Sequence, residues 1–117
     1  ACEVPATVRL NAEDTHPRNA VVLNLSTGGA ELKLTSGGVM AVGGEILLAF
    51  QLHISGRKYL FELPARVVAH HGGAGDKNSY GLAFNPLKDS DFAAIHAYVC
   101  ERLVLKLESP LYSVGNP

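Results

Sequence analysis

Short apolar runs separated by turn-forming residues constrain this chain more than any other feature of its sequence. In runs such as 4–10 and 30–34, apolar and polar residues alternate, which is the period-two pattern of a strand with one buried face. The run 20–25 is instead apolar and β-branched, and is a candidate buried strand. Clusters of Gly, Pro, Asn and Ser lie between the runs, as they do where tight turns join strands. The pattern predicts six or seven short strands, over residues 4–10, 20–25, 30–34, 45–55, 57–63, 66–71 and 79–85.

Two local signals refine this pattern. Ser55-Gly56 lies between two apolar runs and predicts a hairpin. Pro64 has no backbone N–H, and we expect it to interrupt strand pairing between 63 and 66. The hairpins are antiparallel, and the βαβ alternation of a parallel sheet is missing. The chain is therefore expected to form a small barrel or sandwich.

The apolar period changes after residue 85. Apolar residues now recur at steps of three and four, which is the spacing of one face of an amphipathic helix. Asp89 or Ser90 is expected to cap a helix over about 88–107, and the tail over 109–117 is expected to be irregular. The residues predicted to form the buried face of the helix are Phe92, Ile95, Val99, Leu103 and Leu107.

Size and charge exclude several classes of protein. The 117 residues suffice for one domain, and the 47% hydrophobic and 18% charged fractions are those of a globular one. The formal net charge of -1 provides no long-range attraction to nucleic acid or anionic lipid. We expect a cytoplasmic chain, alone or as a domain of a larger or membrane-associated protein. No nucleic-acid polymer partner and no direct membrane insertion are expected.

Catalytic and metal-binding patterns are weak in this sequence. His70 and His71 are adjacent on a predicted strand and would point to opposite faces, so they do not easily share a metal ion. The two cysteines, Cys2 and Cys100, form no metal motif and are read as ordinary apolar residues. There is no nucleophile elbow and no P-loop lysine. The sequence predicts neither an enzyme, nor a metal site, nor a cofactor.

One polar segment stands out between two of the predicted strands. Asn24 and Ser26 are followed by Gly28 and Gly29, and Asn, Ser and Gly are also the usual residues of a plain turn. The spacing Asn-x-Ser-x-x-Gly resembles the signature of the PilZ domain family. A plain turn and a family motif both remain open from these residues alone.

The resemblance to PilZ domains extends over most of the chain, to about Leu107. Four further segments resemble the family's first strand, its Arg-Val-Val strand, its closing strand and the helix that follows. This similarity implies a mainly β fold, a six-stranded antiparallel β-barrel with one C-terminal helix, over residues 1–108. The four segments are 2–10, 65–68, 79–84 and 87–99.

The same resemblance implies a regulatory module that binds cyclic di-GMP and passes the signal to a protein partner or to further domains. The implied ligand-binding residues are Asn24, Ser26, Gly28 and Gly29. The Asn24 oxygen could accept from guanine donors, while the Ser26 hydroxyl and turn N–H groups could bind a phosphate oxygen. The two glycines would admit the ligand to the backbone and permit positive φ.

Two features depart from the family pattern. An Arg-x-x-x-Arg stretch that precedes the first strand in PilZ domains is not present in this chain, and Ala69 replaces an aromatic residue found in some members. Arg18 is a candidate substitute contact for phosphate, because it precedes the motif strand. The alternative hypothesis is a PilZ-like interaction module that does not bind the nucleotide.

Overall fold

The computed structural model describes residues 3–11, 13–35, 39–72 and 79–107, with side chains as far as Arg102. Cys2, most of the turn predicted over 72–78 and the tail predicted over 109–117 lie outside these residues. The elements are β1 (Val4–Arg9), β2 (Arg18–Leu25), β3 (Gly29–Leu34), β4 (Glu45–Ile54), β5 (Arg57–His71), β6 (Ser79–Phe84) and α1 (Asp89–Leu107).

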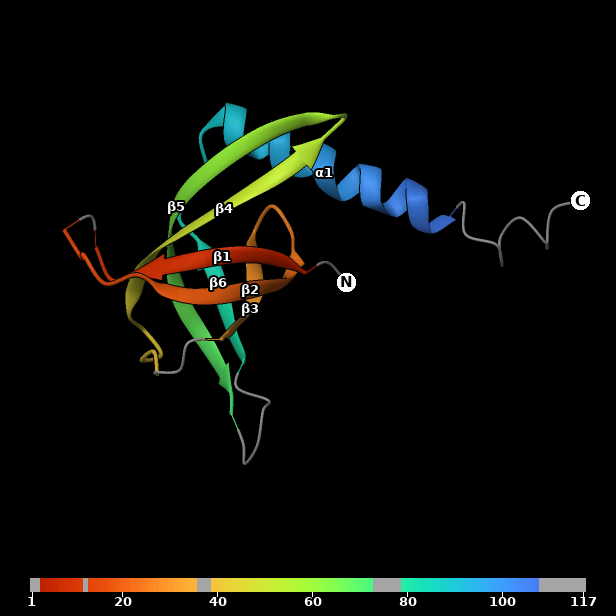
Figure 1. Ribbon diagram of the computed structural model, residues 1–117. Helices are drawn as coiled ribbons and strands as arrows, with labels where there is room; N and C mark the ends of the chain where they lie inside the picture. Colours follow the sequence, from red (N-terminus) through yellow and green to blue (C-terminus); the bar gives the residue numbers. More distant parts are fainter. Residues whose placement is uncertain (1–2, 12, 36–38, 73–78, 108–117) are drawn as a thin grey trace, which may run out of the picture.

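The six strands form one closed antiparallel barrel. Their order around the barrel is β1-β2-β3-β6-β5-β4, and pairing of β1 with β4 closes it. Helix α1 follows β6, passes behind the β4–β5 hairpin and extends beyond the strands (Figure 1). The predicted six-stranded antiparallel barrel with one C-terminal helix is confirmed.

Alternation of side chains along the strands builds the core. In β4 every second residue from Ile46 to Ile54 is buried, and in β3 Ala30, Leu32 and Leu34 are buried. Tyr80 is completely buried, and its hydroxyl oxygen accepts a hydrogen bond from the Met40 N–H at 3.1 Å. The polar end of this large aromatic is therefore satisfied inside the barrel.

The predicted interruption at Pro64 is wrong, because β5 runs unbroken from Arg57 to His71. Pro64 lies opposite Leu47 of β4, and its carbonyl accepts from the Asn85 N–H at 3.1 Å on the other side. The N–H and C=O of one strand residue point the same way, so the missing N–H faces the chain just past the end of β6. The proline costs no hydrogen bond to β4, and the strand continues.

Helix α1 buries part of the predicted face: the prediction is confirmed for Ile95 and Val99 and wrong for Phe92. Ile95 and Tyr98 are buried, and Ala94 and Val99 are partly buried against the core, whereas Phe92 is 49% exposed. Phe92 instead stacks on His96 with ring centroids 6.1 Å apart. The side chains of Leu103 and Leu107 lie outside the described residues.

The start of α1 also differs slightly from prediction. The Lys88 carbonyl accepts the first helical hydrogen bond, from the Phe92 N–H, so Lys88 occupies the cap position. Asp89 and Asp91 lie in the first turn, where their charge favours the positive end of the helix dipole. The predicted cap at Asp89 or Ser90 is therefore wrong, since the cap position lies at Lys88, one residue before Asp89.

Candidate functional site

A β-bulge at Leu23 turns Asn24 to the outside of the barrel. Val22 of β2 pairs with Leu32, but Asn24 pairs with Glu31, so Leu23 is one residue more than β3 can match. In a regular ladder Asn24 would lie opposite buried Ala30 and point inward. The extra residue reverses the alternation, and Asn24 is exposed.

A second bulge lies across the same face, in β5. Val67 pairs with Leu82 and Ala69 with Gly81, so Val68 is the extra residue and is 52% exposed. Between the two bulges lie the outward positions of β3 and β6, which include Gly29, Gly81 and Ala83. These small residues leave a shallow depression of about 370 Å³, bounded by Asn24, Ser26, Glu31 and Val68.

The turn after β2 is organised by the Ser26 hydroxyl. Its oxygen accepts from the N–H groups of Gly28 and Gly29, each at 3.2 Å, and the hydroxyl lies 3.3 Å from the Gly29 carbonyl. The Ser26 N–H donates to that same carbonyl at 2.9 Å. The turn N–H groups expected to meet a phosphate are therefore held by Ser26, which stays exposed at the rim of the depression.

The two glycines of the turn do not have the predicted backbone conformation. Positive φ occurs at Ser55, Gly43 and Gly56 among the described residues, and not at Gly28 or Gly29. A Cβ on Gly29 would lie 2.0 Å from the Leu82 carbonyl oxygen, whereas one on Gly28 would meet only the Ser26 hydroxyl at 4.0 Å. Gly29 is thus required by the close approach of β3 to β6.

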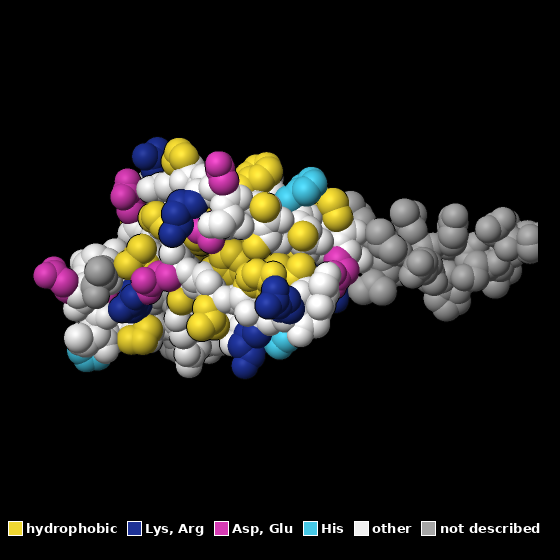
Figure 2. Space-filling view, turned by 90° about the horizontal axis from the view of Figure 1, so that it is seen from above, with side chains coloured by type: hydrophobic (Ala, Val, Ile, Leu, Met, Phe, Trp, Pro, Cys, Tyr) yellow, Lys and Arg dark blue, Asp and Glu magenta, His cyan; other side chains and the backbone are white. Residues whose placement is uncertain are grey.

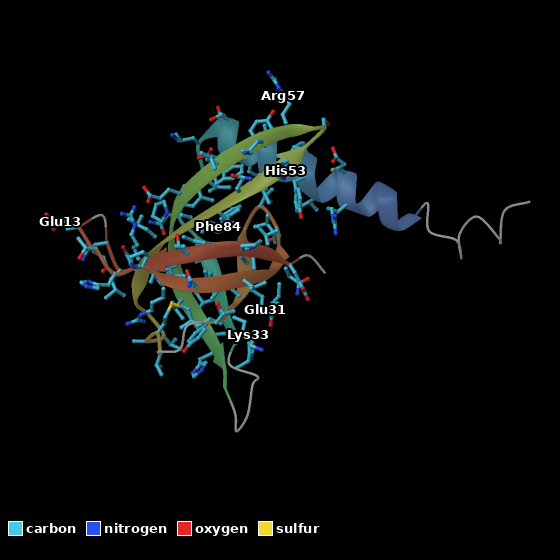
Figure 3. The ribbon with its side chains drawn as sticks, viewed as in Figure 1. Glu13, Glu31, Lys33, His53, Arg57 and Phe84 are labelled. Carbon is cyan, nitrogen blue, oxygen red and sulfur yellow. The ribbon has the colours of Figure 1, made fainter. Side chains whose placement is uncertain are left out.

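Glu31 belongs to this site, and sequence reasoning did not include it. Its Oε1 accepts from the Asn24 Nδ2 at 2.9 Å, and its Oε2 accepts from the Ser79 hydroxyl at 3.5 Å. A carboxylate only accepts, so the amide must turn its NH₂ to Glu31 and leave Oδ1 available to a ligand. Figure 3 shows Glu31 and Lys33 projecting from β3 on the outside of the barrel.

Charge in the depression is negative. Glu31 is the one charged residue among those that line it in the described part of the chain. Arg18, the predicted substitute contact, lies at the opposite end of β2 and donates to the Val39 carbonyl at 3.1 Å. Seven residue steps of about 3.3 Å each separate it along the strand from Leu25, so it does not reach the depression.

The start of β1 lies beside the motif. Val4 pairs with Val22, directly before the bulge, and β1 runs antiparallel to β2. A segment that continues upstream from Val4 in the same direction passes the end of β2 that carries Asn24.

The described residues give little support for a metal site or a membrane-spanning helix. No group of three or more His, Cys, Asp or Glu side chains is placed to hold a metal ion there. No helix in that part of the chain is both long enough and apolar enough to cross a bilayer. The arrangement at the depression offers hydrogen-bond acceptors, a preformed turn and a floor nearly free of side chains.

Comparison with known families identifies one match. The model of the PilZ domain matches residues 1–101. No curated protein matches this sequence.

Two solved structures resemble the fold. The inhibitor of motility MotI/DgrA of Bacillus subtilis superimposes with a TM-score of 0.75 at 17% identity, over 92% of this chain. This chain spans 50% of the length of that protein. The PilZ domain of CeSA from a cellulose-synthesizing bacterium superimposes with a TM-score of 0.52 at 22% identity, over 92% of this chain and 95% of that one. At these identities the likeness concerns the fold.

Proposed function

The chain belongs to the PilZ domain family, and from this premise we propose that it binds cyclic di-GMP in the depression beside Asn24 and transmits the signal to a protein partner. PilZ domains are regulatory binding domains, and catalysis is not part of this proposal. The observation that carries it is the bulge at Leu23, which brings the Asn24 amide to the outer surface next to Ser26 and Gly29.

Each motif residue has a definite part in this proposal. Asn24 Oδ1 accepts from the donor edge of a guanine, because its NH₂ is held by Glu31. A phosphate oxygen can approach Gly28, which is exposed, and compete with the Ser26 hydroxyl for its N–H. Gly29, Gly81 and Ala83 leave room for the flat face of a base.

The positive charge for the phosphates must come from outside the depression. Glu31 opposes an anionic ligand, so arginines on the segment before Val4 are needed to offset it. A charge-assisted hydrogen bond contributes about 1.5–3 kcal/mol, so two of them decide between micromolar and undetectable binding.

Calorimetry with cyclic di-GMP tests the proposal, on this chain and on a version extended upstream by its native sequence. Heat is expected from the extended form. Asn24→Ala and Ser26→Ala are each expected to weaken binding about tenfold, which is the effect of one lost hydrogen bond. Thr7→Ala is the matched control, because Thr7 lies on β1 between Asn19 and Ala49, away from the depression.

A second function is an interaction module that does not bind the nucleotide. It is favoured by Glu31, and by the hydrogen bonds that Asn24 and Ser26 already make within the protein. The absence of heat from both forms of the chain would reject nucleotide binding and leave this alternative.

A further inference from the structure

The β4–β5 hairpin has a backbone edge that no other described strand covers. β5 pairs with β4 along residues 57–66, and with β6 only from Ala65 onward. Residues 57–63 therefore have a strand on one side alone. This part of the sheet remains open although the barrel itself is closed.

Two observations establish which residues point their backbone groups toward the open side. The two-residue turn Ser55-Gly56 makes Ile54 and Arg57 a hydrogen-bonded pair. From this pair onward, hydrogen-bonded and non-hydrogen-bonded pairs alternate along the hairpin. The Pro64 carbonyl accepts a hydrogen bond on the side away from β4. Pro64 lies seven residues from Arg57, an odd number, as the alternation requires. By this alternation, the residues whose N–H and C=O groups point outward are Lys58, Leu60 and Glu62.

The side chains of these three residues are exposed on the outer surface. Leu60 is 77% exposed, the highest value for any large hydrophobic residue that the structure describes. The view from above shows hydrophobic side chains lying between charged ones on this face (Figure 2), and Arg57 projects from the hairpin (Figure 3). An open strand edge with an exposed leucine is a site for pairing with another strand.

We propose that this edge pairs with the same edge of a second copy of the chain, antiparallel and centred on Leu60. The three outward residues are, in order, a lysine, a leucine and a glutamate. When two such edges pair antiparallel, each lysine lies opposite a glutamate and the leucines lie opposite each other. Lys58 then lies opposite Glu62 of the second copy, Glu62 lies opposite its Lys58, and the two leucines meet on the axis. Opposite charges directly across a strand pair are favourable, and like charges are not.

The surroundings of the edge are compatible with this pairing. Glu62 uses Oε2 in its ion pair with Arg9, which leaves Oε1 for the lysine of the second copy. Pairing ends before Pro64, whose carbonyl is occupied by Asn85. The Ser55 N–H and hydroxyl donate to Glu101 at 3.1 Å, which fixes the hairpin on α1 and holds the edge in place.

The interface is two-fold symmetric and short. A two-fold contact must be self-complementary, and this edge satisfies that requirement. So few residues bury much less than the roughly 1,200 Å² of a stable complex, so the dimer is weak and forms at high concentration. Its formation raises the local concentration of any partner site that each copy carries.

Sedimentation velocity tests the pairing across concentrations up to about 1 mM, the weak-binding range that a short interface implies. The average mass of the unmodified chain is expected to rise with concentration. Lys58→Glu and Glu62→Lys should each weaken association at least tenfold, because each sets like charges opposite one another. An equimolar mixture of the two variants should associate again, as opposite charges then meet in both pairs.

A second variant tests the backbone part of the pairing. Leu60→Pro removes an outward N–H while keeping the ladder to β4, as Pro64 already does at an equivalent position. It should fold and remain monomeric, whereas Leu60→Val should still associate. A monomer for the unmodified chain at every concentration, or no recovery in the mixture of charge variants, would overturn the proposal.

Discussion

The two adjacent glycines after β2 have different physical roles, although a motif places them side by side. Gly29 lies where β3 and β6 come closest, and no side chain fits between it and the Leu82 carbonyl. Gly28 faces open space without positive φ. At this scale the fold requires Gly29, and the proposed ligand site requires the exposed surface around Gly28.

Alanine at these two positions should therefore differ in its effect on stability. Gly29→Ala is expected to lower the free energy of unfolding by at least about 2 kcal/mol, because the Cβ would force β3 away from β6. Gly28→Ala should change it by no more than about 0.5 kcal/mol, as for an ordinary surface substitution. Urea denaturation measures both, and equal losses would contradict the assignment.

Residue roles were only partly predictable from the sequence. The spacing of Asn24, Ser26 and Gly29 indicated the segment, but not the partner of Asn24. Glu31 could have been found by pairing the two strands across the turn, had the bulge at Leu23 been known. Nothing in the apolar run Val21-Val22-Leu23 marks which residue is the extra one, since all three fit a buried strand equally well.

At the scale of the elements, two prolines mark where the β4–β5 hairpin leaves the barrel. Pro5 lies on β1 next to β4, and the β1–β4 pairing begins at Ala6. Pro64 lies on β5 where pairing with β6 ends. Each proline lacks a donor at a point where the ladder stops, so the hairpin beyond them is free to pack on α1.

Glu101 makes a polar contact between α1 and this hairpin. Its carboxylate accepts from both the Ser55 N–H and the Ser55 hydroxyl, and Ser55 has a positive φ of 51°. Glu101→Ala is expected to lower the free energy of unfolding by about 0.5–1.5 kcal/mol, the usual contribution of such hydrogen bonds.

The matched control is Cys100→Ala, one residue earlier on the same helix. Cys100 is exposed, and its Sγ lies 3.6 Å from His96 of α1 itself. This substitution should leave stability nearly unchanged in thermal unfolding. If Glu101→Ala were equally neutral, the hairpin would not depend on the carboxylate.

Strands and helix were predictable because alternation and helical spacing are strong signals. The errors arose where tertiary context decided the outcome. Pro64 is tolerated because β6 ends beside it. Phe92 is exposed because the side of α1 that packs on the barrel carries Ile95 and Tyr98. Amphipathic spacing leaves the choice between neighbouring helix faces open when apolar residues occur on both.

At the scale of the whole molecule, the barrel presents two separate surfaces. The depression beside Asn24 lies over β2, β3, β6 and the end of β5, whereas the open hairpin edge lies in the first half of β5. The start of β1 lies beside the first surface, because Val4 pairs with Val22 directly before the bulge. The proposed ligand binding and the proposed pairing with a second copy can therefore be altered independently by substitution.

The most direct test of the account follows the backbone and side-chain amide resonances of the upstream-extended chain during titration with cyclic di-GMP. We expect the largest shifts at the Asn24 side chain, Gly28, Gly29 and Gly81, with little change at Leu60. Shifts that centre elsewhere on the barrel, or no shifts at a ligand concentration of about 1 mM, where even weak binding is detectable, would contradict it.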